Sequence, residues 1–94
     1  MWSMYIVKCA DGSLYTGIAK DVTARVHAHN HTAKGSKHTR ARRPVALIKS
    51  WPMGGRANAL RAEWKMKRLR KAEKLAMIQN GVWTPETRQW SRAP

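Results

Sequence analysis

The sequence predicts an α+β fold in which a compact three-stranded antiparallel sheet is flanked by helices, in the order β-β-α-β-α-α. Two short apolar runs enclose a Gly-containing turn, a third follows a basic loop, and helical periodicity governs the chain after residue 55. The 94 residues suit one domain with a modest core, so a buried site for a large cofactor is not expected.

The first two apolar runs, each of which contains a tyrosine, are expected to form a β-hairpin. Its turn contains Asp11-Gly12, a dipeptide common in tight hairpins. A two-residue loop at these positions would place Tyr5 and Tyr15 on opposite faces of the hairpin. A three-residue loop, with Gly12 in the left-handed conformation of a G1 bulge, shifts the register by one residue and places both on one face. We expect the three-residue loop.

A helix is predicted to begin after Asp21, whose carboxylate is a good N-cap, and to end near Asn30. Arg25 and His29 are four residues apart, so they share one face of this helix. These two side chains are therefore expected to point into the same part of the molecule.

A third strand is predicted over residues 45–51, after the basic loop that Pro44 closes. Its continuous apolar start is typical of a central strand that is covered on both faces. Pro52 and the glycines that follow it are expected to end the strand.

The chain after Arg56 shows the periodicity of a long helical segment. Its apolar stripe consists of Ala59, Ala62, Met66 and Leu69. The helical pattern continues to Asn80-Gly81, a C-cap signal. No proper N-cap residue lies between Leu69 and Ala72, so one bent helix and two separate helices are both consistent with the sequence.

Residues 1–82 are expected to form the domain, and residues 83–94, which are polar and end in proline, a C-terminal tail. Trp51 and Trp64 are expected in the core because their neighbours are apolar. The two tryptophans of the tail are candidates for packing against a neighbouring subunit, so the sequence is compatible with a homo-oligomer.

The charge balance indicates a polyanionic partner. Nineteen Lys and Arg residues and five Asp and Glu residues give a net charge of +14, and nucleic acid is the commonest polyanion. No acid occurs between Asp21 and Glu63, and basic residues accumulate in the loop from Lys34 to Arg43. Such a loop suits phosphate contact, with a solvated loop as the alternative. The expected phosphate contacts are Lys20, Lys34, Lys37, Arg40, Arg42 and Arg43.

The sequence also indicates the cellular compartment in which the protein is expected. Cys9 is the only cysteine, so an intrachain disulfide is impossible. No apolar stretch of about 18 residues occurs, and the N-terminus lacks the basic start and apolar body of a signal peptide. We expect a soluble, cytoplasmic protein that is nucleoid-associated when it is bound to DNA.

The alternating histidines His27, His29 and His31 do not predict a zinc site. On a helix, His29 points away from the other two. No cysteine or nearby acid completes a set of zinc ligands.

Glu63 is the acid that most needs an explanation. Of its helical neighbours at three and four residues, only Lys67 is polar, and a carboxylate in an apolar setting is costly without a compensating positive charge. One interpretation is an ion pair with Lys67. The other is a ligand for Mg²⁺, which typically takes one or two protein carboxylates together with waters and phosphate oxygens.

Five motif positions occur in order along the chain: Tyr5, Tyr15-Thr16-Gly17, Arg25, His29 and Glu63. Taken singly, the two tyrosines would be assigned to strand packing. In this order and spacing, the five positions resemble the GIY-YIG nuclease superfamily. The similarity is to its small stand-alone bacterial members, the UPF0213-like proteins, and it extends over roughly residues 2 to 80. It is carried further by the stretches ADGSLYTGIAKDVTARVHAHN, KHTRARRPV and ALRAEWKMKRLRKAEKLAMI.

The resemblance implies hydrolysis of DNA phosphodiesters with one divalent metal ion, Mg²⁺, for which Mn²⁺ is a substitute. Tyr5 would orient or deprotonate the attacking water and pass its proton towards His29, and Tyr15 would hold the water or the phosphate. Arg25 would bind a non-bridging oxygen, and Glu63 would bind the metal ion.

The implied role of Tyr5 requires a lowered pKa. A free phenol has a pKa of about 10, and we expect the metal ion, Arg25 and Lys20 to lower it. His38, at a position where relatives have tyrosine or histidine in the basic loop, is a further candidate phosphate contact.

Some positions depart from the family pattern. Ser3 and Met4 replace the glycine and isoleucine of the first motif, and Thr16 replaces the isoleucine of the second, which alters strand packing more than chemistry. The asparagine that follows the glutamate in many relatives has no counterpart at its usual distance, and the nearest is Asn80.

Two functions from different classes remain open at this point. The first is a metal-dependent DNA endonuclease, with single-stranded or branched DNA favoured because no separate domain is present to read duplex sequence. The second is a non-catalytic nucleic-acid-binding module on the same fold. Glu63 and Tyr5 separate them, because a carboxylate that faces phosphates would only repel them in a simple binder.

Overall fold

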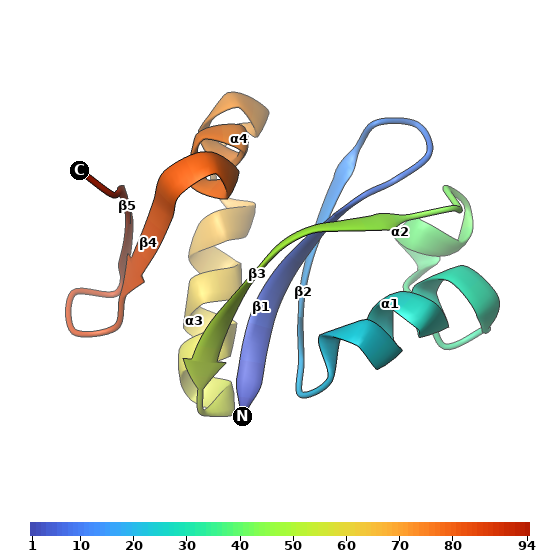
Figure 1. Cartoon of the computed structure of the whole chain (residues 1–94), viewed down its shortest axis with the longest axis horizontal. Helices are drawn as coiled ribbons and strands as arrows, with labels where there is room; N and C mark the ends of the chain where they lie inside the picture. The colour runs from blue at the N-terminus through green and yellow to red at the C-terminus, as the bar shows by residue number, and fades with distance from the viewer.

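The computed structural model describes residues 1–94. Its strands are β1 (Trp2–Lys8), β2 (Leu14–Ala19), β3 (Ala46–Gly54), β4 (Gly81–Thr84) and β5 (Gln89–Arg92). Its helices are α1 (Val22–His31), α2 (Lys37–Arg40), α3 (Arg56–Lys67) and α4 (Lys71–Asn80). β1 to β3 form an antiparallel sheet in the order β2-β1-β3, with α1 and α2 on one side and α3, α4 and the β4–β5 hairpin on the other (Figure 1). The predicted α+β fold class is confirmed, and α2 and the β4–β5 hairpin are additions to the predicted order.

The β1–β2 hairpin has the predicted three-residue register. Tyr5 pairs with Gly17 and Val7 pairs with Tyr15, while Gly12 has a φ of +85°. Paired residues and alternate residues of an antiparallel ladder share a face. Both tyrosines therefore lie on the face that α1 covers, and they pack in or against one buried cluster with residues of that helix.

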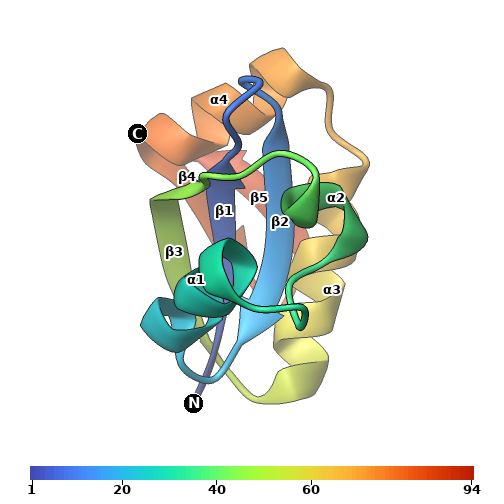
Figure 2. The same cartoon turned by 90° about the vertical axis from the view of Figure 1, so that its right-hand side faces the viewer.

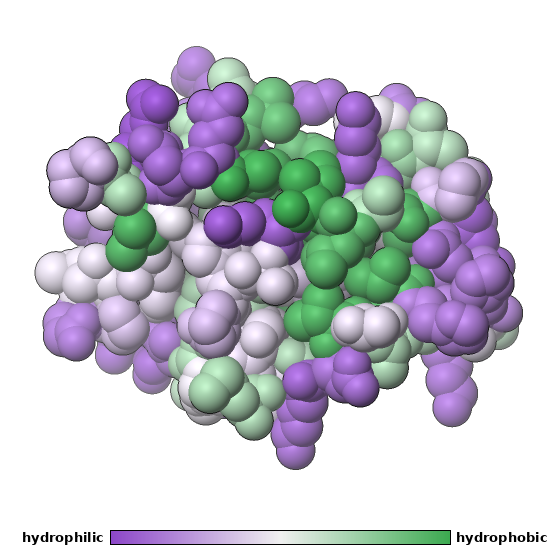
Figure 3. All heavy atoms as spheres, viewed as in Figure 1, coloured by the Kyte–Doolittle hydropathy of each residue, from purple (hydrophilic) through white to green (hydrophobic).

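β3 is an edge strand, so the prediction of a central strand was wrong. The centre belongs to β1, in which residues 4–7 are all buried, whereas residues 46–50 of β3 are exposed. Apolar side chains accordingly gather on the face of the molecule where β3 runs (Figure 3). Apolar content does not decide strand order, and the tight hairpin leaves only one edge of β1 free for β3. Pro52 is tolerated because an edge strand has positions that need no donor, and the strand ends at Gly54, with a φ of +75°.

The pattern after Arg56 forms two helices, which settles the alternative that the sequence left open. α3 buries Ala59, Ala62 and Met66 against the sheet and runs beside β2 (Figure 2). α4 begins without a side-chain N-cap at the preceding residue; instead, the Glu73 carboxylate accepts a hydrogen bond of 2.9 Å from the Arg70 backbone N–H. A glutamate that reaches back in this way satisfies one of the free donors of the first turn.

Residues 83–94 were expected to form a tail, and they instead complete a β-hairpin that packs on α3. Trp83 is 8% exposed, and its indole N–H donates to the Asn58 side chain at 2.9 Å. The Trp90 indole donates to the Ala62 carbonyl at 2.9 Å. The polar composition of this segment does not predict the hairpin, because two large indoles provide most of its buried surface. Trp83 therefore belongs to the domain's own core, and Trp90 packs against it.

Two apolar clusters lie on opposite faces of the sheet. The larger joins Met4 and Ile6 of β1 to α3, and the smaller joins Tyr5 and Val7 of the same strand to α1. The alternation along β1 thus separates a purely apolar core from the face that carries the tyrosines. No helix in the protein combines the length and apolar character needed to cross a membrane.

Candidate active site

Tyr5 lies at the centre of the candidate site. It is 1% exposed on the central strand, and its ring lies over Gly17 of the neighbouring strand. A Cβ atom at Gly17 would stand 2.5 Å from the Tyr5 hydroxyl oxygen, which is closer than real Cβ atoms approach other atoms. The glycine of the second motif is therefore required by the position of this phenol.

His29 connects Tyr5 to the basic segment that follows α1. Its ring is fully buried, with Nε2 at 2.7 Å from the Tyr5 hydroxyl and Nδ1 at 2.7 Å from the hydroxyl of Thr39. Thr39 is also fully buried, and its hydroxyl donates to the Ser36 carbonyl at 3.1 Å. α2 thus holds the far side of the His29 ring.

This network is compatible with a His29 that carries its proton on Nδ1. When the Thr39 hydroxyl gives its one proton to the Ser36 carbonyl, its oxygen accepts from Nδ1–H. Nε2 is then an acceptor for the Tyr5 hydroxyl. The Ser36 backbone N–H, 3.4 Å from Nδ1, favours the opposite tautomer and is the weaker contact. The result is a directed chain from Tyr5 through His29 to Thr39.

Burial sets the protonation states of this pair. It raises the pKa of Tyr5 to about 12, and the positive charge of Arg25 opposes that shift only in part. Burial also lowers the pKa of His29 to about 4, with the charges of Arg25 and Arg43 acting in the same direction. The expected lowering of the Tyr5 pKa is therefore wrong for the protein by itself, because desolvation of a phenolate outweighs the nearby guanidinium. At neutral pH, Tyr5 is protonated and His29 is neutral.

Lys20 does not take part in this electrostatic environment. Its ammonium group lies 5.7 Å from the centre of the Trp2 ring, at the far end of β1.

Tyr15 lies beside the same histidine. Its ring makes an edge contact with His29, with centroids 5.4 Å apart, and stacks on His38 with centroids 5.8 Å apart. The Lys67 ammonium group, which comes from α3, lies 5.9 Å from the centre of the Tyr15 ring. Tyr15 is thus the point where the hairpin, α2 and α3 meet.

Arg25 and Glu63 approach the phenol from two different helices. The Arg25 guanidinium donates to the Lys34 carbonyl at 2.8 Å and lowers the pKa of Tyr5, whereas the negative charge of Glu63 raises it. The Glu63 side chain is 18% exposed and forms an ion pair with Lys67 at 3.4 Å. The ion pair expected from the spacing is therefore present, and it leaves the carboxylate partly accessible.

Glu63 is compatible with a metal site that the substrate helps to complete. No group of three or more His, Cys, Asp or Glu side chains is arranged to hold a metal ion, so an all-protein cage is absent. One partly exposed carboxylate fits the coordination of Mg²⁺, which keeps several waters and takes its other ligands from phosphates. Asn80 does not contribute, because its side chain donates to the Ala93 carbonyl at 3.4 Å at the end of α4.

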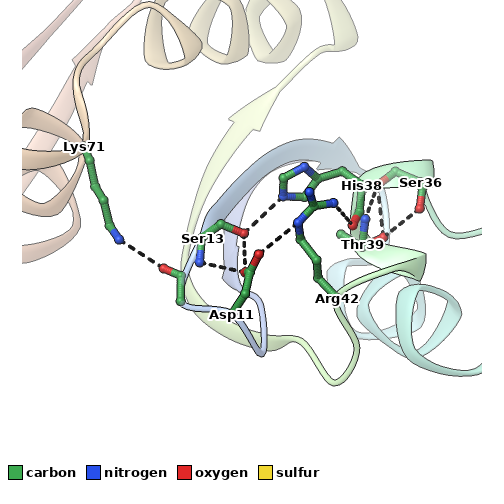
Figure 4. Close-up of polar contacts among 8 residues, drawn as sticks. Asp11, Ser13, Ser36, His38, Thr39, Arg42 and Lys71 are labelled. Atoms are coloured by element: carbon green, nitrogen blue, oxygen red, sulfur yellow. Dashed lines mark hydrogen bonds and ion pairs between the residues drawn. The ribbon is translucent and has the colours of Figure 1, made fainter.

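The predicted phosphate-binding residues fall into two groups. Lys20, Lys34, Lys37 and Arg40 are exposed. Arg42 is held by an ion pair with Asp11 at 2.9 Å and by the His38 carbonyl, as Figure 4 shows. Arg43 donates to the His29 and Thr32 carbonyls at the end of α1. Its guanidinium stabilises the C-terminal turn of the helix that carries His29.

His38 joins the basic segment to the β1–β2 turn. Its Nε2 lies 3.2 Å from the Ser13 hydroxyl, which is bonded in turn to the Asp11 carboxylate at 2.6 Å (Figure 4). Together with its stacking on Tyr15, this contact fixes the position of α2 relative to the sheet.

Thr39 and Ser36 are residues that the sequence reasoning missed. The Ser36 hydroxyl accepts a hydrogen bond from the Thr39 backbone N–H at 3.1 Å and so caps α2. Serine is one of the residue types preferred at a helix N-cap, so Ser36 is the signal that the sequence offers here. It indicates that part of this segment is a helix and not an open loop.

Comparison with known proteins agrees with this geometry. The family model of the GIY-YIG catalytic domain matches residues 1–76. A UPF0213 protein of Staphylococcus epidermidis is 51% identical over 78 residues, covering 83% of this chain and 94% of the relative. One of Desulfotalea psychrophila is 42% identical over 77 residues, covering 82% and 70%. The solution NMR structure of a UPF0213 protein from Bacillus halodurans is 36% identical, covers 84% of each chain and has a TM-score of 0.54.

The family match covers the segment that contains the buried tyrosine–histidine pair. GIY-YIG proteins are generally endonucleases that act on DNA with divalent metal ions. The matched region contains both tyrosines, the arginine, the histidine and the glutamate described above. This chain belongs to the GIY-YIG family.

Proposed function

We propose that this protein is a metal-dependent DNA endonuclease that hydrolyses phosphodiester bonds, with a preference for single-stranded or branched DNA. The observation that carries the proposal is the 2.7 Å hydrogen bond between the Tyr5 hydroxyl and Nε2 of a neutral, buried His29. A protein that only bound nucleic acid would have no need for a phenol aligned on a proton acceptor.

The arrangement suggests how a water could be activated at neutral pH. Because the pKa of Tyr5 is about 12, its hydroxyl does not act as a free phenolate base. It donates to Nε2 of His29, so its oxygen can accept a hydrogen bond from the attacking water and orient it, and Thr39 holds the imidazole in the receptive tautomer. Tyr15 orients the water or the phosphate from the same face of the hairpin.

Charge on the reacting phosphate would be balanced by Arg25 and by a metal ion held by Glu63. The Arg25 guanidinium would donate hydrogen bonds to a non-bridging oxygen. Mg²⁺, or Mn²⁺ in its place, supplies Lewis-acid polarisation of the phosphoryl oxygen when it is bound. The exposed Lys34, Lys37 and Arg40 would contact flanking phosphates.

Cleavage of labelled single-stranded, duplex and branched DNA in Mg²⁺, Mn²⁺ or EDTA tests this proposal. Tyr5→Phe keeps the ring and removes the proton, so cleavage should fall by a factor of roughly 100 to 10,000 while DNA binding persists. Glu63→Gln should abolish metal-dependent cleavage, and Glu86→Ala, which removes an exposed acid in the β4–β5 turn, should not. Binding without cleavage in any metal would support the alternative, a non-catalytic nucleic-acid-binding module.

A further inference from the structure

Trp64 is a large aromatic residue that the fold leaves in solvent. Its side chain was expected in the core, but it is 56% exposed, whereas Trp51 and Trp83 are 9% and 8% exposed. On α3, Trp64 lies opposite the buried stripe that includes Ala62, because two residues correspond to about 200° of helical rotation. Its nearest apolar neighbours in sequence, Ala62 and Met66, lie on the buried side of the helix, so tertiary packing does not account for this indole.

Positive charges surround this indole. The Arg68 guanidinium lies 4.6 Å from the centre of the ring, and the Lys65 ammonium group lies 5.9 Å from it. A hollow of about 310 Å³ next to the ring is lined by Leu60, Arg61, Trp64, Lys65 and Arg88. No acidic side chain lines the hollow, so its charge is complementary to a polyanion.

Arg88 reaches the hollow from a distant part of the chain. It lies in the β4–β5 turn and is the one non-glycine residue with a positive φ, 56°. Its backbone N–H donates to the Thr84 carbonyl at 2.8 Å, which keeps the turn in this conformation. The C-terminal hairpin therefore adds a cation to Arg61 and Lys65 of α3 and to Arg68 at its C-cap.

The hollow and the candidate active site share α3. Glu63 precedes Trp64 directly, and the two side chains are about 100° apart around the helix. One turn later the pattern repeats: Lys67 pairs with Glu63 and lies over Tyr15, and Arg68 lies over Trp64. A strand that leaves the phosphate at Glu63 would meet the indole within one turn of the helix.

We propose that Trp64 is a stacking platform for an unpaired base of single-stranded DNA next to the scissile phosphate. Arg61, Lys65, Arg68 and Arg88 contact the phosphates on either side of that base. An indole offers its face to any base, and such stacking is tolerant of sequence. Duplex DNA cannot use the platform, because its bases are already stacked. This inference rests on the proposed function, and it assigns a residue to the preference for unpaired DNA.

Binding of fluorescein-labelled oligothymidylate in EDTA, followed by fluorescence anisotropy, tests the platform without cleavage. Trp64→Ala should weaken binding roughly tenfold or more, and Trp64→Phe, which keeps an aromatic face, should retain most of the affinity. An abasic oligonucleotide of the same length carries the same phosphates and no bases. Its affinity for Trp64→Ala should match its affinity for the wild type.

Two further variants separate stacking from charge and from general damage. Arg68→Ala should weaken the oligothymidylate and the abasic strand alike and should reduce the salt dependence of both by about one phosphate contact. Leu75→Ala removes an exposed apolar side chain on α4 (45% exposed) and should bind all strands as the wild type does. Circular dichroism should show that each variant is folded.

The platform is refuted if Trp64→Ala binds oligothymidylate as tightly as the wild type, or if it loses the same affinity for the abasic strand. Either result leaves the nuclease proposal standing, because cleavage is measured separately. Conversely, base-dependent loss at Trp64 in a protein that cleaves no DNA would support the platform and reject the nuclease.

Discussion

Acidification is expected to destabilise this protein through His29. The folded protein holds the pKa of this imidazole at about 4 because the ring is buried, whereas an unfolded chain has the ordinary value near 6.5. Between these two pH values the imidazole is therefore protonated in the unfolded chain and neutral in the folded protein. The stabilising contribution is complete above about pH 6.5 and is lost progressively as the pH falls towards 4.

The size of the effect follows from the pKa difference. A difference of about 2.5 units corresponds to about 3 kcal/mol of unfolding free energy at the acidic end. That is a large share of the stability of a small domain. In the folded protein His29 is protonated only near its pKa of about 4, which removes the acceptor for the Tyr5 hydroxyl, so cleavage should decline as the pH approaches 4.

Urea unfolding followed by tryptophan fluorescence between pH 7 and pH 4 measures this dependence. His29→Gln is less stable at neutral pH but should lose most of the pH-dependent part. His27→Gln, which changes an exposed histidine on the same helix, should keep the wild-type dependence. If the wild type and His29→Gln lose the same free energy between pH 7 and pH 4, the buried neutral imidazole is not the cause and the argument fails.

Three further changes test how the site is built. Gly17→Ala places a Cβ atom 2.5 Å from the Tyr5 hydroxyl, so urea unfolding should show a loss of about 1 to 3 kcal/mol. Gly55→Ala, where a Cβ atom meets nothing within 4 Å, should cost less, and equal losses would contradict the steric argument. Thr39→Val should lower cleavage about tenfold and alter its pH profile, Thr39→Ser should restore both, and failure of serine to do so would reject the tautomer assignment. Trp83→Ala should cost about 3 to 5 kcal/mol in thermal unfolding, whereas a free tail would leave stability unchanged.

The sequence determined the local features of the site. Asp21 predicted where α1 begins, and its carboxylate indeed accepts from the Ala24 N–H at 3.0 Å. Gly12 predicted the hairpin register, and with it the common face of Tyr5 and Tyr15. These predictions succeed because capping and turn geometry are decided by residues within a few positions of one another.

Predictions from the sequence were wrong where contacts between distant parts of the chain decide strand order and burial. The apolar start of β3 predicts a central strand, but strand order depends on which edge of β1 the hairpin leaves free. The polar composition of residues 83–94 predicts a tail. The segment folds because its two indoles are buried against α3, a contact that the local sequence does not reveal. The apolar neighbours of Trp64 predict a core position, but neighbouring residues in a helix point to different sides, and this indole is exposed.

The electrostatics of the candidate site also required the tertiary structure. From sequence alone, the positive charge of Arg25 and Lys20 was expected to lower the pKa of Tyr5. The fold instead buries the phenol against His29 and places Lys20 over Trp2, and desolvation raises the pKa to about 12. Residue types and spacing thus determined which groups take part. Only the fold determined their protonation, because burial depends on what the rest of the chain packs around them.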